Sequence, residues 1–150
     1  MLTPPRLGPR ADIALLTLRI VVGLAFVLHG YPKIQHPVTW LAGMIPGTPG
    51  WLQALAAFAE FGGGIALIAG LATPLFAFLI ACNMFVAIFI VLVPHGATFV
   101  STAPHAVTYE LPLMYLVAAI ALILLGPGKF SLDGVRGARG SSARRSRRRM

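Results

Sequence analysis

Long apolar runs separated by short polar segments dominate this chain. Four of the runs approach or reach the roughly 20 residues that cross a hydrocarbon core about 30 Å thick, and they cover residues 13–30, 51–70, 74–93 and 109–125. The pattern predicts an all-α protein that spans the membrane as a four-helix bundle. What remains is too short for a soluble catalytic domain, so chemistry is expected in the bundle, on its loops or in a partner.

The composition strengthens this prediction. Hydrophobic residues make up 57% of the 150 residues, charged residues make up 11%, and mean hydropathy is +0.83. Because soluble domains carry about 25% charged residues, the balance excludes an ordinary soluble protein. We therefore expect the lipid bilayer to be the main surroundings of this chain.

The basic residues indicate how the chain is oriented. They gather at both ends, as Arg6, Arg10, Lys129 and the seven arginines between Arg136 and Arg149. An even number of spans places both ends on one side, and the positive-inside rule makes that side cytoplasmic. A cleaved signal peptide is the competing interpretation of the first span. Arg19 would interrupt the apolar region of such a signal, and no small-x-small cleavage site follows it.

Three parts of the chain follow from this arrangement: a basic N-terminus (1–12), a membrane domain (13–133) and an Arg-rich tail (134–150). The tail holds seven of the twelve Lys and Arg residues, with almost nothing to bury, so we expect it to be disordered. Seven of the eight units of formal net charge therefore belong to a tail that we expect beside anionic lipid. It does not indicate nucleic-acid binding.

Cysteine and histidine usage bears on cofactors. Cys82 is the only cysteine, so no intramolecular disulfide, CxxC pair or haem-attachment motif exists. Apart from His29, the histidines fall on loops, which disfavours a bis-histidine haem. We predict neither metal nor haem, and redox chemistry would need another bound cofactor or a partner subunit.

Glu60 lies near the middle of an otherwise uncharged apolar run. Ionisable residues at that depth are costly and usually face a partner charge or a ligand pathway. Counting helix rise from the expected outer ends places Arg19, Glu60 and Asn83 about 14–16 Å deep. We therefore expect the three to satisfy one another, because a buried charge is tolerable only when it is paired. Such a network either fixes helix register or serves a ligand.

Small residues surround Glu60 at helical spacing, namely Ala56, Ala57, Gly63 and Gly64. They either let a neighbouring helix approach closely or leave room for a flat ligand beside the carboxylate.

A second polar group, His29, Lys33 and Glu110, is expected near the outer surface. Lys33 could equally extend its charge to the interface, and Glu110 suits the positive end of its helix. Trp40 and Trp51 fit an interfacial segment, which either anchors the outer end or forms a lid over this group.

Three strings support a family resemblance: LRIVVGLAFVLHGYPKI, AAFAEFGGGIALIAGLATPL and YELPLMYLVAAIALILLGPGKFSLD. Over residues 18–133 the chain resembles the DoxX family of small four-helix bacterial membrane proteins. The resemblance implies that the family's recurrent polar positions are Arg19, His29, Lys33, Glu60, Glu110 and Asp133.

Relatives in this family include membrane subunits of thiosulfate:quinone oxidoreductase, and others are associated with redox-stress complexes. The resemblance thus implies a bacterial inner-membrane location and a quinone-linked role. This chain lacks a thiol pair for sulfur chemistry, which argues against thiosulfate.

The leading hypothesis is a membrane subunit that binds a quinone-like headgroup and couples it to a redox protein partner or another membrane subunit. Glu60 and Glu110 would accept or relay protons, while His29 and Lys33 would donate hydrogen bonds. Arg19 would hold Glu60 ionised or orient it. Two alternatives stay open: an assembly or scaffold subunit that uses the network only for packing, and a small proton-coupled transporter that uses Glu60 as the titrating group.

Overall fold

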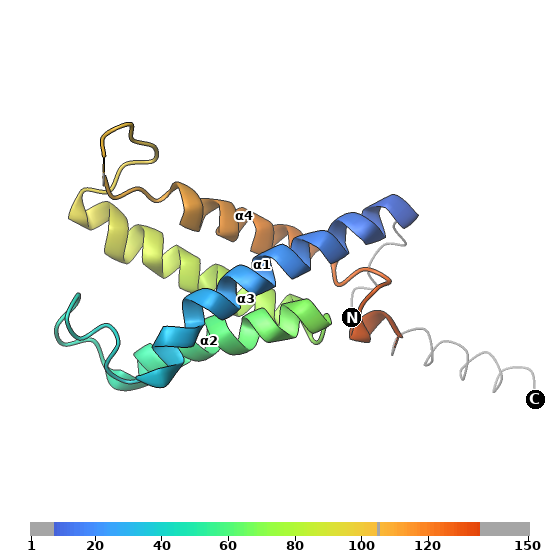
Figure 1. Cartoon of the computed structure of the whole chain (residues 1–150), viewed down its shortest axis with the longest axis horizontal. Helices are drawn as coiled ribbons and strands as arrows, with labels where there is room; N and C mark the ends of the chain where they lie inside the picture. The colour runs from blue at the N-terminus through green and yellow to red at the C-terminus, as the bar shows by residue number, and fades with distance from the viewer. Residues whose placement is uncertain (1–7, 105, 136–150) are drawn as a thin grey trace, which may run out of the picture.

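The computed structural model describes residues 8–104 and 106–135, and helices form most of this part (Figure 1). The only β-pairing in those residues is an isolated bridge between Thr98 and Thr108. The regular elements are α1 (Pro9–Gln35), α2 (Gly50–Ala69), α3 (Thr73–Val86), the π-helical turn η1 (Ala87–Leu92), the 3-10 turn η2 (Val93–His95) and α4 (Glu110–Leu125).

Three of the helices are long and apolar enough to cross a membrane: α1, α2 and the continuous helix Thr73–His95. Their positions confirm the expected spans at 51–70 and 74–93, and α1 extends the expected span 13–30 at both ends. α4 is apolar but has 16 residues, which give about 24 Å of helix. The chain is therefore a mostly helical, multi-pass membrane protein.

The helices pack side by side with two well-separated ends. α1 lies along α2, and α3 packs against both α2 and α4. Figure 1 shows the two long connections, 36–49 and 96–109, at one end, which we call the loop end. The start of α1, the turn between α2 and α3, and residues 126–135 lie at the other end, which we call the terminal end.

Glycine allows the closest approach between α1 and α2. A Cβ added to Gly64 would lie 2.6 Å from the carbonyl oxygen of Gly23 and 2.7 Å from the amide nitrogen of Val27. A Cβ on Gly30 would lie 2.5 Å from the amide nitrogen of Phe61. Gly64, one of the small residues beside Glu60, thus lets the backbones of α1 and α2 approach closely. The sequence had left open whether these small residues serve helix contact or leave room for a ligand.

The outer surface of the helices is apolar. Phe58 (51% exposed), Leu28 (65%) and Leu124 (71%) are examples of large side chains that point away from the core. The lone cysteine, Cys82, is also exposed. A water-soluble monomer rarely presents so much contiguous apolar surface, whereas lipid requires it. The core itself is built from smaller sets of residues on all four helices, including Leu15, Leu67, Ile80 and Leu122.

The third helix changes its hydrogen-bond pattern as it reaches the loop end. It passes from α to π geometry over Ala87–Leu92 and then to 3-10 geometry over Val93–His95. Pro94 has no amide hydrogen for the regular i−4 bond to Ile90, so a regular α-helix cannot continue through it undisturbed.

Residues 126–135 fold back and close the terminal end. The Asp133 carboxylate accepts hydrogen bonds from the amides of Ala72 (3.0 Å), which immediately precedes α3, and Thr73 (2.9 Å), the first residue of α3. Gly70 ends α2 with φ +67°, and a Cβ there would overlap the Arg19 guanidinium. Asp133 therefore acts as the N-terminal cap of a helix that lies about 60 residues earlier in the chain. Residues 1–7 of the expected basic N-terminus (1–12) and residues 136–150 of the Arg-rich tail (134–150) that was assigned to anionic lipid lie outside the described residues.

Candidate functional site

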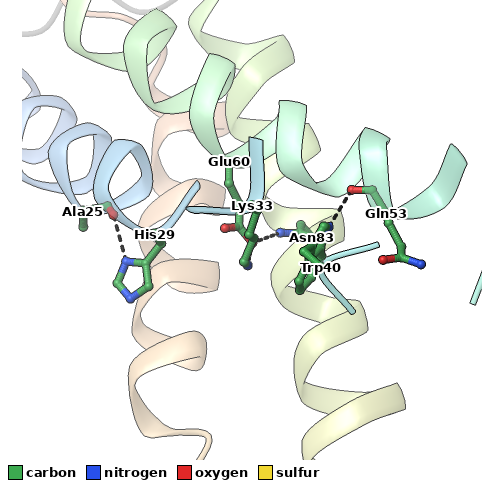
Figure 2. A network of polar contacts seen from close by, with 7 residues as sticks. All are labelled: Ala25, His29, Lys33, Trp40, Gln53, Glu60 and Asn83. Atoms are coloured by element: carbon green, nitrogen blue, oxygen red, sulfur yellow. Dashed lines mark hydrogen bonds and ion pairs between the residues drawn. The ribbon is translucent and has the colours of Figure 1, made fainter. Parts of the chain in front are cut away.

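Glu60 lies in the interior of α2 and is 2% exposed. Its Oε1 accepts two hydrogen bonds, one from the charged Lys33 Nζ of α1 at 2.5 Å and one from the neutral Asn83 Nδ2 of α3 at 2.6 Å. Figure 2 shows both side chains pointing toward the carboxylate from different helices. The expected contact between Glu60 and Asn83 is confirmed, and Lys33 is the cation that makes the carboxylate tolerable.

The second carboxylate oxygen, Oε2, is different. It is buried and has no hydrogen-bond partner among the residues that the structure describes. Glu60 also lines a cavity of about 110 Å³, together with Phe26, His29, Lys33, Met84, Leu111, Pro112 and Tyr115. One water needs only roughly 10–15 Å³ of such space, so the cavity admits a larger group. We call it the Glu60 cavity.

The expected pairing of Arg19 with Glu60 is wrong. Arg19 is fully buried at the terminal end, where its Nη2 donates a hydrogen bond to the carbonyl oxygen of Phe130. Its Nε and Nη1 have no partner in residues 8–104 and 106–135. Arg19 thus holds the closing segment 126–135 and takes no part in the Glu60 cavity.

The error has a geometric cause. The sequence-based depth assumed that the first helix ends at Gly30, but α1 continues through Pro32 to Gln35. Gly30 packs against Phe61, so the last turns of α1, and not Arg19, are level with Glu60. The 14 residues from Arg19 to Lys33 correspond to about 21 Å of helix. Lys33 is 24% exposed and reaches inward, so it does not simply extend its charge to the interface.

His29 is exposed and contributes to the lining of the Glu60 cavity, and a backbone contact defines the tautomer of its ring. Nδ1 lies 2.8 Å from the carbonyl oxygen of Ala25, and because a carbonyl only accepts, Nδ1 carries the hydrogen. Nε2 is then the free ring nitrogen. Figure 2 shows the ring turned back toward Ala25 and away from Glu60. The His29 and Phe26 rings each lie near Tyr115, with centroids 6.2 Å and 5.0 Å away, so one wall of the cavity is aromatic.

Glu110 stands apart from this group. It is the first residue of α4 and is exposed, and the lining of the cavity begins with the next two residues, Leu111 and Pro112. The structure therefore brings together His29, Lys33, Glu60 and Asn83, and it leaves Glu110 beside the cavity. Arg19 is at the opposite end.

Gln53 organises the connection 36–49, and sequence analysis missed it. Its Oε1 accepts from the amide of Leu41 at 2.8 Å, and its Nε2 donates to the carbonyl of Thr48 at 3.0 Å. Its own carbonyl accepts from Trp40 Nε1 at 3.0 Å. The Lys33 ammonium lies 4.4 Å from the centroid of the Trp40 ring. The sequence signal that could have indicated this role is a single side-chain amide in an apolar run. In the structure Gln53 is 3% exposed.

Replacing Gln53 with alanine is expected to release this connection. The change removes two side-chain hydrogen bonds, each worth about 1 kcal/mol, and leaves Leu41 without its acceptor. Hydrogen exchange of the amides in 36–49 should become at least about tenfold faster. The matched control is Gln35→Ala, because Gln35 is exposed. Equal exchange in both variants would contradict the role of Gln53.

The fold and the buried site define a small helical multi-pass membrane protein with a paired carboxylate on a cavity wall. A family model described as DoxX matches residues 14–93, which is more than half of the chain. The chain belongs to the DoxX family, as the resemblance implied. Membership indicates a small membrane protein, often linked to redox-related function.

The matched residues cover α1 from residue 14 onward, α2 and the third helix through Val93, and they stop before α4. The resemblance over 94–133 therefore stays a prediction. No curated protein and no solved structure matches the chain.

Proposed function

We propose that this protein is a membrane subunit of a redox complex, which binds a quinone-like headgroup in the Glu60 cavity and couples it to a partner oxidoreductase. The observation that carries the proposal is that Glu60 lines that cavity and that its buried Oε2 has no hydrogen-bond partner among the described residues. A buried carboxylate oxygen without a donor is costly, and a bound polar ring would supply the missing contact.

The lining of the Glu60 cavity suits a flat ring with polar oxygens. Phe26 and Tyr115 give an apolar, aromatic wall, and Met84 adds an adaptable side chain. Polar groups are few in this lining, which is the usual construction of a small-molecule site.

Each polar residue has a proposed task. A quinone takes up two protons and two electrons when it is reduced. Glu60 Oε2 and His29 Nε2 would each take up a proton that comes from solvent and pass it to a ring oxygen. Lys33 keeps Glu60 ionised before each proton arrives, the task first assigned to Arg19. Asn83 fixes the carboxylate orientation through Oε1. Glu110, exposed at the start of α4, relays protons between the cavity and solvent.

The topology is part of the proposal. We infer that α4 crosses the membrane with the other three helices, which would place both chain ends in the cytoplasm of a bacterial inner membrane. The distribution of Lys and Arg supports this orientation. The Glu60 cavity would then open toward the outer half of the bilayer, and electrons would come from a partner protein, which we propose to be a redox enzyme or another membrane subunit.

Fluorescence of Trp40 tests the binding step, since its ring contacts Lys33. In a Trp51→Phe background Trp40 is the only tryptophan, and a quinone that enters the cavity should quench it saturably. We expect His29→Ala to weaken binding by about tenfold. The matched control is His95→Ala, because His95 Nδ1 makes the same i−4 contact, to Val91, outside the cavity. Equal quenching curves for the three proteins would refute the site.

Turnover separates the proposal from its rivals. Partner-dependent quinone reduction should fall about a hundredfold in Glu60→Gln, within the range for loss of a general acid or base. The two hydrogen bonds to Glu60 Oε1 also fit a scaffold subunit. In that case Glu60→Gln should lower the yield of the complex, and the complex that assembles should have normal activity. A transporter predicts proton-coupled flux in proteoliposomes without any redox partner.

A further inference from the structure

The polar atoms at the Glu60 cavity differ in what they can still bond. Oε1 of Glu60 already accepts from Lys33 and Asn83, and Oε2 accepts from none of the described residues. A carboxylate paired with lysine is ionised, and an ionised carboxylate accepts hydrogen bonds but cannot donate them. The unpartnered oxygen of Glu60 can therefore be satisfied only by a hydrogen-bond donor.

We propose that the cavity selects a ring bearing a hydroxyl group, and thus the reduced, dihydroxy form of a quinone-like couple over the dicarbonyl form. The inference rests on the proposed function and names the redox state that the same site prefers. A ring hydroxyl can donate to Oε2, which removes the one unsatisfied polar atom of Glu60. A ring carbonyl only accepts, so it cannot.

Lys33 could favour the opposite, dicarbonyl form. The Lys33 ammonium has three hydrogens and uses one on Glu60, so it could also hold a ring carbonyl. That arrangement would displace solvent from the cavity and still leave Oε2 without a donor. Because an unsatisfied buried charged acceptor is penalised more than a satisfied lysine gains, the hydroxyl form should bind at least about tenfold more tightly.

Two pairs of probes test this selection on the full chain in lipid nanodiscs, with empty discs correcting for partition into lipid. The first pair is 4-methoxyphenol and 1,4-dimethoxybenzene, which differ in one hydroxyl and are not quinones. The second pair is tetramethylhydroquinone, kept anaerobic, and tetramethylbenzoquinone. Saturation-transfer NMR titrations give the affinity ratio within each pair. We expect the hydroxyl member of each pair to bind about tenfold or more tightly than the other member. For the second pair, a tenfold preference for the reduced form raises the midpoint potential of the bound two-electron couple by about 30 mV.

Glu60→Gln should change the preference of the cavity between the two forms, which a purely structural role of Glu60 would leave unchanged. With Lys33 and Asn83 still donating to the amide oxygen, the amide nitrogen takes the place of Oε2 and becomes a donor. The preference in the second pair should therefore reverse toward the dicarbonyl. His95→Ala, outside the cavity, should keep the wild-type ratios.

The possible failures are distinguishable. Equal affinities within both pairs for the wild type, or an unchanged preference in Glu60→Gln, overturn the selection of the hydroxyl form and leave quinone binding standing. If neither tetramethyl compound binds while 4-methoxyphenol keeps its advantage over the diether, the hydroxyl rule holds and the quinone assignment is wrong.

Discussion

Replacing Gly64 with alanine should lower the free energy of unfolding by about 3 kcal/mol, at the upper end of the range for overpacked cores. The new Cβ would meet the backbone of Gly23 and Val27 at 2.6–2.7 Å. Backbone atoms cannot rotate away as a side chain can, so α1 and α2 would have to separate. Titration with SDS in mixed micelles, followed by circular dichroism, measures the loss.

Gly62→Ala is the matched control, since Gly62 lies two residues away on the same helix. A Cβ there would meet only the ring of Phe58, at 3.1 Å, and that ring can turn. We expect a change within about 1 kcal/mol, because alanine is the better helix former. An equal loss in both variants would mean that any added methyl group, and not the contact between α1 and α2, disturbs the fold.

The helices were predictable because their signal is local. Length and hydrophobicity are read directly from each run, and the spans at 51–70 and 74–93 lie within two residues of the helices. The end of α1 was less predictable. Pro32 disfavours helical geometry for the residue before it, yet α1 continues through Pro32 to Gln35. Lys33 lies on this last part of α1, where it pairs with Glu60.

The site was partly predictable for the same reason. Glu60 stood out as a lone carboxylate at depth, and Asn83 followed from its depth on a third helix. The partner of Arg19 did not follow, because it is the backbone carbonyl of Phe130, and a carbonyl carries no sequence signature. Gln53 bonds mainly to the backbone of a neighbouring connection, and its role was hidden in the same way.

Lys33→Met should be the most damaging single change at the Glu60 cavity, with an expected loss of about 3 kcal/mol. It removes the cation from a carboxylate that is 3% exposed at its side chain and leaves Asn83 as the only partner. Breaking a buried pair by removing one member typically costs about 3–5 kcal/mol. Unfolding in SDS should show the loss, with Lys129→Met as control, because Lys129 is exposed.

The reverse change should cost less. In Glu60→Gln the remaining lysine is 24% exposed and can turn its ammonium toward the loop end, so we expect a loss of about 1 kcal/mol. The double variant Lys33→Met/Glu60→Gln removes both charges and should lie within about 1 kcal/mol of wild type, since a buried pair often contributes little net stability. A Lys33→Met loss no larger than that of Lys129→Met would show that Glu60 does not need its cation.

The double variant also separates packing from chemistry. It keeps the helices together and removes the charged, accepting oxygen from the cavity wall. For a scaffold subunit, any loss should appear in the yield of the complex, and the complex that assembles should keep its activity, because the network then serves only to fix helix register. A quinone-binding subunit should assemble normally and lose partner-dependent quinone reduction. Measuring complex yield and turnover on the same preparation therefore decides whether the Lys33–Glu60 pair is retained for the fold or for the reaction.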